Sequence, residues 1–161
     1  MDEEGNIIGA ATRGECHNGS KRLHPVVHLH VFNSRGELYL QKRPQWKDIQ
    51  PGRWDTAVGG HVDLGESVEM ALRREAEEEL CLTGFTPERL PHYVFESDRE
   101  RELVFPHRCT YDGEIRPSAE TDGGRFWNTT EIHEAMGKGF FTPNFESEYK
   151  RLFGNEPDTL L

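Results

Sequence analysis

The chain has 161 residues, of which 34% are hydrophobic and 30% are charged, and its formal net charge is −10 at pH 7. This length suits one domain with a real core, and we expect residues 1–161 to form a single domain. The charge argues against nucleic acid as a general partner, because phosphate contacts need clustered lysines and arginines. An acidic protein that handles an anionic substrate needs metal ions or a local basic pocket.

The cysteines and the apolar segments bear on the compartment. Cys16, Cys81 and Cys109 form no CxxC pair, so neither a disulfide framework nor a thiolate zinc site is predicted. The N-terminus lacks a basic start with a long apolar run, and no stretch reaches the roughly 20 apolar residues of a membrane span. We therefore expect a cytoplasmic protein without a membrane partner. The oligomeric state is left open.

The predicted elements are strands mixed with a few helices. Strands are expected, in chain order, at residues 25–32, 37–41, 53–58, 92–96, 103–111 and 125–127. Turns are expected at residues 33–36, which close a hairpin, and at Gly59-Gly60. A short helix is expected at residues 131–136, and a last helix with Thr142 as its cap and Pro143 at its first position. This α+β pattern predicts a mixed sheet covered by helices.

A longer helix is predicted up to Leu80, with Ser67 as its N-cap and no Gly or Pro between Glu66 and Leu80. At 3.6 residues per turn, one stripe of this helix is apolar and should face the core. Its members are Val68, Ala71, Leu72 and Ala76.

Three carboxylates of this helix crowd the apolar stripe. Glu75 and Glu79 fall inside the stripe and Glu78 lies on its edge, at spacings that bring like charges together. Burying unpaired carboxylates is costly, and divalent cations such as Mg²⁺ would offset the cost because they take oxygen ligands. The alternative is an acidic, solvent-exposed helix face, and the helical pattern alone favours neither.

The spacing from Gly60 onward resembles the Nudix box, G-x5-E-x7-R-E-U-x-E-E-x-G-U, where U is apolar. The matching positions are Gly60, Glu66, Arg74, Glu75, Ala76, Glu78, Glu79 and Leu82. The departure is Cys81, which stands where the pattern has the Gly of the turn that leaves the helix. The resemblance implies a Nudix-type α/β/α sandwich with a central mixed β-sheet. It also implies that Glu75, Glu78 and Glu79 hold Mg²⁺ or Mn²⁺ against a diphosphate, and that Arg74 orients one of them.

A second resemblance spans most of the chain and is to the isopentenyl diphosphate isomerases, which are themselves Nudix-fold proteins. The matching pieces are CHNGSKRLH, FNSRGELYLQKR, PGRWD, GGH and ERE. The resemblance implies a second metal site, with the ligands His17, His24, His61, Glu100 and Glu102. Imidazole and carboxylate together suit Zn²⁺ or Mn²⁺. The alternative reading makes the histidines ordinary strand residues and the glutamates part of a solvated charge run.

The same resemblance implies a basic pocket for the substrate diphosphate. Arg43, Lys47 and Arg13 occupy positions that grip the diphosphate in the isomerases, as cations on phosphate should. Ordinary surface charge is the alternative. Trp46, Trp54 and Trp127 could line a pocket, but aromatic residues near strands are more often core, and we expect core.

Hydrolysis is favoured over isomerisation. The isomerases place a catalytic Cys directly before the G-H pair, where this chain has Gly59, which cannot donate a proton. Their Nudix box is degraded, whereas this one is nearly complete. We expect a metal-dependent hydrolase that cleaves a phosphoanhydride bond of a small organic diphosphate, either a nucleoside diphosphate derivative or an isoprenoid-like one. The alternatives are isopentenyl diphosphate isomerase and a non-catalytic diphosphate-binding sensor. Candidate general bases are Glu78, Glu79 and Glu102.

Overall fold

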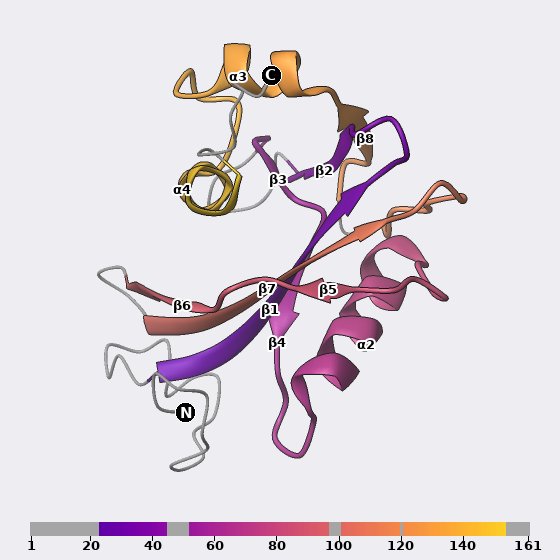
Figure 1. The fold of residues 1–161 in the computed structure, drawn as a ribbon, viewed down its shortest axis with the longest axis vertical. Coiled ribbons are helices and arrows are strands. Elements are labelled where there is room, and N and C mark those ends of the chain that lie inside the picture. Colours follow the sequence, from indigo (N-terminus) through magenta and orange to yellow (C-terminus); the bar gives the residue numbers. More distant parts are fainter. Residues whose placement is uncertain (1–22, 45–51, 97–100, 120, 154–161) are drawn as a thin grey trace.

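The computed structural model describes residues 23–44, 52–96, 101–119 and 121–153. At its centre, two long strands, β1 (Leu23–Phe32) and β7 (Arg101–Thr110), run parallel to each other (Figure 1). The other strand pairs of the described sheet are antiparallel, so the sheet is mixed, as predicted.

The remaining strands extend the sheet on both sides of this central pair. Strands β2 (Leu38–Lys42) and β4 (Val58–His61) pair with β1. Strands β3 (Trp54–Thr56) and β8 (Gly124–Trp127) pair with β2. The strands that pair with β7 are β5 (Glu88–Arg89) and β6 (Tyr93–Glu96). The two-residue strand β5 was not predicted, since so short a segment shows no periodicity.

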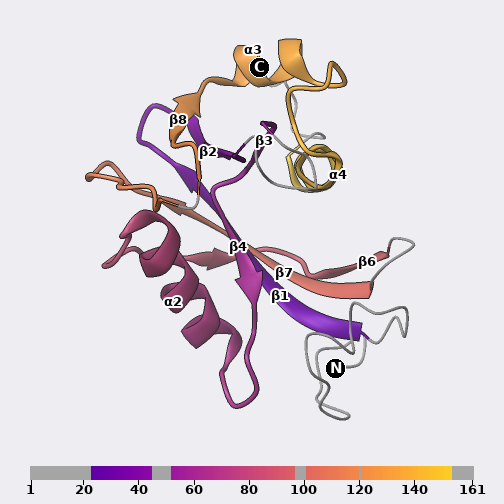
Figure 2. The ribbon, with the colours of Figure 1, turned by 180° about the vertical axis from the view of Figure 1, so that it is seen from behind.

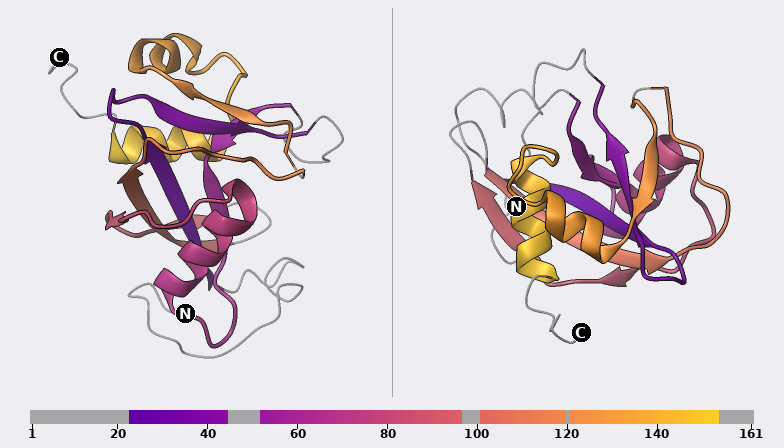
Figure 3. Two further views of the ribbon diagram at one scale, coloured as in Figure 1. Left: turned by 90° about the vertical axis from the view of Figure 1, so that its right-hand side faces the viewer. Right: turned by 90° about the horizontal axis from the view of Figure 1, so that it is seen from above.

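Helices cover both faces of the central strands. Helix α2 (Val68–Leu80) lies on one face, beside β4 and β1, and α4 (Pro143–Leu152) lies on the other face (Figures 2 and 3). The short helix α3 (Thr129–Ala135) follows β8 and packs into the same core as α4. This arrangement confirms the predicted α+β fold with a central mixed sheet. Among the described residues, none of the helices has the length and apolarity that a membrane crossing requires.

Each helical layer encloses its own core. On the α2 side, Val27, Leu29 and Val31 of β1 pack with Ala71, Leu72, Ala76 and Leu80 of the helix. The core on the α4 side contains Leu38, Leu40, Trp127, Ile132, Phe141 and Phe145. Trp54 packs against this second core, so Trp54 and Trp127 are core residues, as expected, while Trp46 lies outside the described residues.

Helix α2 follows its predicted start and its predicted apolar stripe. The Ser67 side chain caps the helix by accepting a hydrogen bond from the Met70 amide at 3.1 Å. The helix ends at Cys81, whose backbone adopts the left-handed conformation, with φ 53° and ψ 36°. The chain therefore leaves the helix by the turn that the motif's glycine would allow.

One turn prediction is wrong. Gly59 and Gly60 do not form a turn but lie within β4, where Gly59 is the register partner of His28 and Gly60 of Val27. The strand expected at residues 53–58 is correspondingly split into β3 and the start of β4. Tertiary pairing with β1 overrides the preference of glycine for turns, and the actual turn falls at Leu64 and Gly65, where Gly65 has φ 89°.

Candidate active site

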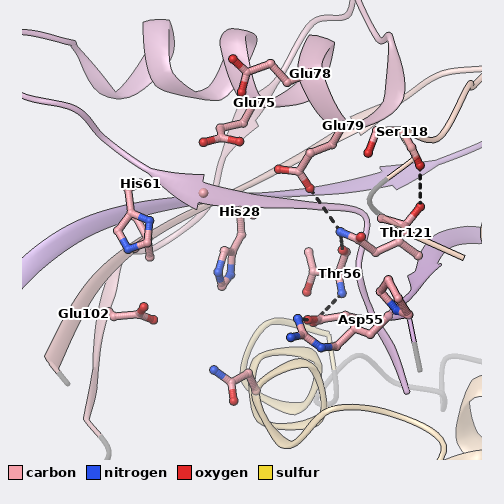
Figure 4. Close-up of a pocket in the computed structure, with 17 residues that line it drawn as sticks. His28, Asp55, Thr56, His61, Glu75, Glu78, Glu79, Glu102, Ser118 and Thr121 are labelled. Atoms are coloured by element: carbon pink, nitrogen blue, oxygen red, sulfur yellow. Dashed lines mark hydrogen bonds and ion pairs between the residues drawn. The ribbon is translucent and has the colours of Figure 1, made fainter. Parts of the chain in front are cut away.

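A pocket of about 600 Å³ lies where α2, the central strands and α4 converge (Figure 4). The strands contribute Val26 and His28 from β1, Gln41 from β2, Asp55 and Thr56 from β3, Gly59, Gly60 and His61 from β4, and Glu102 from β7. Helix α2 contributes Glu75, Glu78 and Glu79. The structure therefore brings the three helix carboxylates to the same pocket as two of the predicted second-site ligands.

The three helix carboxylates differ in burial as the stripe predicts. The Glu78 side chain is 59% exposed, whereas that of Glu75 is 13% exposed, and Glu79 is largely buried. The amide nitrogen of Gln41 donates to the Glu79 carboxylate at 3.2 Å. Burial raises the pKa of Glu79 to about 9, and the neighbouring Glu75 carboxylate acts in the same direction. A divalent cation would stabilise the ionised form of this crowded pair.

Arg74 holds the carboxylates that surround the end of β4. Its guanidinium donates to Glu66 at 2.7 and 2.9 Å, to Glu75 at 3.1 Å and to Glu78 at 3.3 Å. It also donates to the backbone carbonyl of His61 at 3.0 Å. The bidentate contact with Arg74 lowers the pKa of Glu66. This geometry suits the orienting role expected for Arg74, with Glu66 as the anchor of the guanidinium.

A second group of potential metal ligands lies around the side chain of His61, at the same end of β4. One ligand atom from each of His24, His61 and Glu102 lies within 4.8 Å of the others. His24 and Glu102 are register partners on β1 and β7, and His24 Nε2 is 3.6 Å from Glu102 Oε2. The rings of His24 and His61 stack with centroids 5.1 Å apart.

This second group has the donor chemistry of a transition-metal site. Burial raises the pKa of Glu102, but the neighbouring imidazoles of His24, His28 and His61 together outweigh burial and lower that pKa. Two imidazoles beside an ionised carboxylate fit Zn²⁺ or Mn²⁺. The other two predicted ligands, His17 and Glu100, lie outside the described residues.

Of the predicted phosphate-binding residues, the structure places one. Arg43 lines the pocket, and its guanidinium is 3.7 Å from the Asp55 carboxylate. Arg13 and Lys47 lie outside the described residues. Within the described part of the chain, no other lysine or arginine side chain lines the pocket apart from Arg43.

Sequence reasoning missed a buried polar cluster at the floor of the pocket. His28 lines the pocket, and its Nδ1 lies 2.8 Å from the carboxylate of Glu148 on α4. The sequence did contain a signal. His24, His28 and His30 are separated by even numbers of positions along a strand whose other residues are apolar, which puts three imidazoles on one face. Nothing in the sequence pointed to Glu148 as their partner.

The mixed sheet between helices and the carboxylates of α2 are what a Nudix protein would show. A family model described as the NUDIX domain matches residues 22–146. The chain belongs to the NUDIX family.

Individual relatives include both hydrolases and isomerases. The chain is 31% identical over 157 residues to an uncharacterised Nudix hydrolase of Streptomyces coelicolor, covering 94% of this chain and 85% of the relative. It is 26% identical over 172 residues to isopentenyl-diphosphate Delta-isomerase 1 of Photorhabdus laumondii, covering 99% and 96%. The crystal structure of DR0079 from Deinococcus radiodurans matches with a TM-score of 0.78 at 22% identity, over 95% of this chain and 96% of that one, which shows the same fold. Both resemblances drawn from the sequence are confirmed.

Proposed function

We propose that this chain is a metal-dependent hydrolase that cleaves the phosphoanhydride bond of a small organic diphosphate. The observation that carries the proposal is the convergence of Glu75, Glu78 and Glu79 on one pocket. Such a set of crowded carboxylates is costly to fold around without cations. Membership of the NUDIX family, and the similarity to a Nudix hydrolase over most of the chain, support the same function.

Two sets of residues would hold the metal ions. Glu75, Glu78 and Glu79 suit Mg²⁺ or Mn²⁺, which take oxygen ligands. His24, His61 and Glu102 suit Zn²⁺ or Mn²⁺, with His17 and Glu100 as further ligands. When bound, such ions neutralise charge on phosphoryl oxygens and activate water.

The chain's own residues would position the substrate and the carboxylates. Arg43 lines the pocket, where its guanidinium can donate to phosphate oxygens, and Arg13 and Lys47 are proposed for the same task. Arg74 is tied to Glu66 and holds Glu75 and Glu78 in place. Either Glu78, Glu79 or Glu102 would take a proton from the attacking water.

The lining of the pocket favours a polar group on the diphosphate. Outside the carboxylates and histidines, the described lining includes the polar residues Gln41, Thr56, Ser118, Thr121 and Asn144. Among the described residues, the apolar side chains that line it are Val26 and Pro44. An isoprenoid tail would need a largely apolar site, whereas a nucleoside or sugar could use these hydrogen-bonding groups.

The alternative isomerase activity lacks its thiol in this pocket. Gly59 occupies the position of the catalytic Cys, and neither described cysteine lines the pocket. Cys81 is exposed beyond the end of α2. Cys109 is buried in the α2-side core, where burial raises the pKa of its thiol to about 11.

The test is release of phosphate or pyrophosphate from a panel of nucleoside diphosphate derivatives and isoprenoid diphosphates with Mg²⁺ or Mn²⁺. Native protein is compared with the double variant Glu78→Gln and Glu79→Gln. We expect release from a polar member of the panel and a loss of at least about a hundredfold in the double variant.

The matched control is Glu77→Gln, because Glu77 is an exposed carboxylate of the same helix that does not line the pocket. It should keep native turnover. Equal losses in both variants would contradict the assigned site. Isomerisation of isopentenyl diphosphate, or ligand binding without turnover of any panel member, would instead favour the isomerase or the sensor.

A further inference from the structure

Glu148 is a buried carboxylate that joins α4 to the sheet beneath the pocket. Its side chain is 1% exposed. One carboxylate oxygen lies 2.8 Å from His28 Nδ1 and also accepts a hydrogen bond from the Tyr93 hydroxyl of β6. The other oxygen lies 2.5 Å from His30 Nε2. Three donors on one buried carboxylate indicate that it is ionised.

An ionised carboxylate at this depth needs a cationic partner. Among the described contacts of Glu148, the groups able to carry a positive charge are His28 and His30. His30 is fully buried, and its Nδ1 has no partner among the described residues, so protonating it would bury an unsatisfied N–H. His28 is 19% exposed and lines the pocket, where water or a ligand can accept from its second nitrogen. The proton therefore belongs on His28.

The backbone pairing leaves the Nε2 side of the His28 ring open toward β4. His28 is the register partner of Gly59, and a Cβ built at Gly59 would lie 3.4 Å from His28 Cδ2 and 3.7 Å from Nε2. Because residue 59 has no side chain, nothing from that position covers this edge. Figure 4 shows His28 between His61 and Glu102 on one side and Asp55 and Thr56 on the other.

The charges around His28 favour its protonated form. Burial by itself lowers the pKa of His28, but the surrounding carboxylates, chiefly the adjacent Glu148, together outweigh burial and raise that pKa to about 9. Glu102 on β7 and Asp55 on β3 act in the same direction. His28 is thus a cation in a pocket where Arg43 is the only described lysine or arginine.

We propose that His28 is a substrate-binding residue that donates from Nε2 to a phosphate oxygen of the diphosphate, and that Glu148 positions it through Nδ1. The inference rests on the diphosphate substrate of the proposed function. His28 would then be a second cationic side chain, besides Arg43, that binds phosphate in an otherwise acidic pocket.

The experiment measures binding of magnesium pyrophosphate by calorimetry at pH 6 and pH 8, with each variant compared with native protein at the same pH. His28→Asn should bind about tenfold more weakly at both values. Glu148→Gln removes the carboxylate that most favours a protonated His28, and burial then lowers the pKa of His28, so its affinity should fall at both values and should fall further at pH 8 than at pH 6. His30→Gln is the matched control, since it loses a Glu148 contact outside the pocket and should bind normally.

Native affinity in His28→Asn at pH 8 would overturn the proposal. So would a matching loss of Mn²⁺ affinity without pyrophosphate, because His28 would then be a metal ligand.

If the variants do not fold, NMR of histidine-labelled native protein decides. A charged His28 ring at pH 7.5 that shifts with magnesium pyrophosphate supports the proposal, and a neutral or unmoved ring overturns it. Hydrolysis that persists while His28→Asn binds normally would refute this inference alone, and binding through His28 without turnover would refute only the hydrolase.

Discussion

Gly60 shows how a single missing side chain shapes the site. A Cβ built at Gly60 would lie 2.1 Å from both Cδ and Oε2 of Glu75. The Glu75 carboxylate therefore occupies the space that any other residue at position 60 would need. Glycine is required here by close approach and not by a turn, because Gly60 lies within β4.

We expect Gly60→Ala to displace the Glu75 carboxylate and to weaken Mg²⁺ affinity by about tenfold or more. The free energy of unfolding should change by no more than about 1 kcal/mol, because the overlapping atoms are the flexible end of a side chain. Calorimetric Mg²⁺ titration and urea unfolding measure the two quantities.

A double-mutant cycle with Glu75→Ala provides the control. If Gly60→Ala acts only through the carboxylate, it should add no further loss of affinity in that background. An additive loss would mean that the substitution damages the site by another route.

Helix α2 ends in the turn that the Nudix motif predicts, although Cys81 stands where the motif has glycine. The amide of Cys81 donates to the Glu77 carbonyl at 3.0 Å, and that of Leu82 donates to the Ala76 carbonyl at 3.2 Å. The bond from Leu82 requires the left-handed backbone that Cys81 adopts, which costs a residue with a Cβ roughly 1 kcal/mol. The tertiary structure thus maintains the turn against local preference.

Cys81→Gly should stabilise the protein by about 0.5–1 kcal/mol, because it removes the Cβ that opposes the left-handed conformation. Chemical denaturation at neutral pH measures the change.

Cys81→Ala separates loss of the thiol from loss of the Cβ, and it should leave stability near the native value. A gain as large in the alanine variant as in the glycine variant would show that the backbone conformation is not the cause.

Across the whole molecule, Glu148 links layers that are distant in the chain. It connects α4 to β1 and β6. Burial raises the pKa of Glu148, but the contacts with His28 and His30 outweigh burial and leave that pKa well below its usual range. Its stabilising contribution is therefore present above the ordinary carboxyl pKa and is lost in acid. His28 behaves in the opposite sense, since its pKa is raised.

The metal-free protein should lose stability as the pH rises from 6.5 to 9. His28 stabilises the fold fully below its ordinary pKa of 6.5, and this contribution, on the order of 3 kcal/mol, is lost as the pH passes about 9. The raised pKa of Glu79 adds a loss of the same sign. Urea unfolding across this range measures the slope.

His28→Asn removes one of these groups and should flatten the slope, while the part due to Glu79 remains. Parallel stability curves for the native protein and the variant would contradict the assignment of the proton to His28.

The sequence by itself determined the features that depend on local spacing. The apolar stripe of α2, its Ser67 cap and the greater burial of Glu75 and Glu79 than of Glu78 all follow from 3.6 residues per turn. The family followed from a motif with fixed spacing, and the mixed sheet followed from the order of strands and helices. These features need no knowledge of which distant segments meet.

Only the tertiary structure decided which distant residues meet and how the glycines are used. His28 and Glu148 are 120 residues apart, so no periodicity relates them, and their contact exists because α4 packs across β1. Gly59-Gly60 has the composition of a turn, but pairing with β1 makes it a strand. Pairing and packing energies between distant segments exceed local preferences. They bring His28 to the pocket and place the buried Glu148 carboxylate beside it.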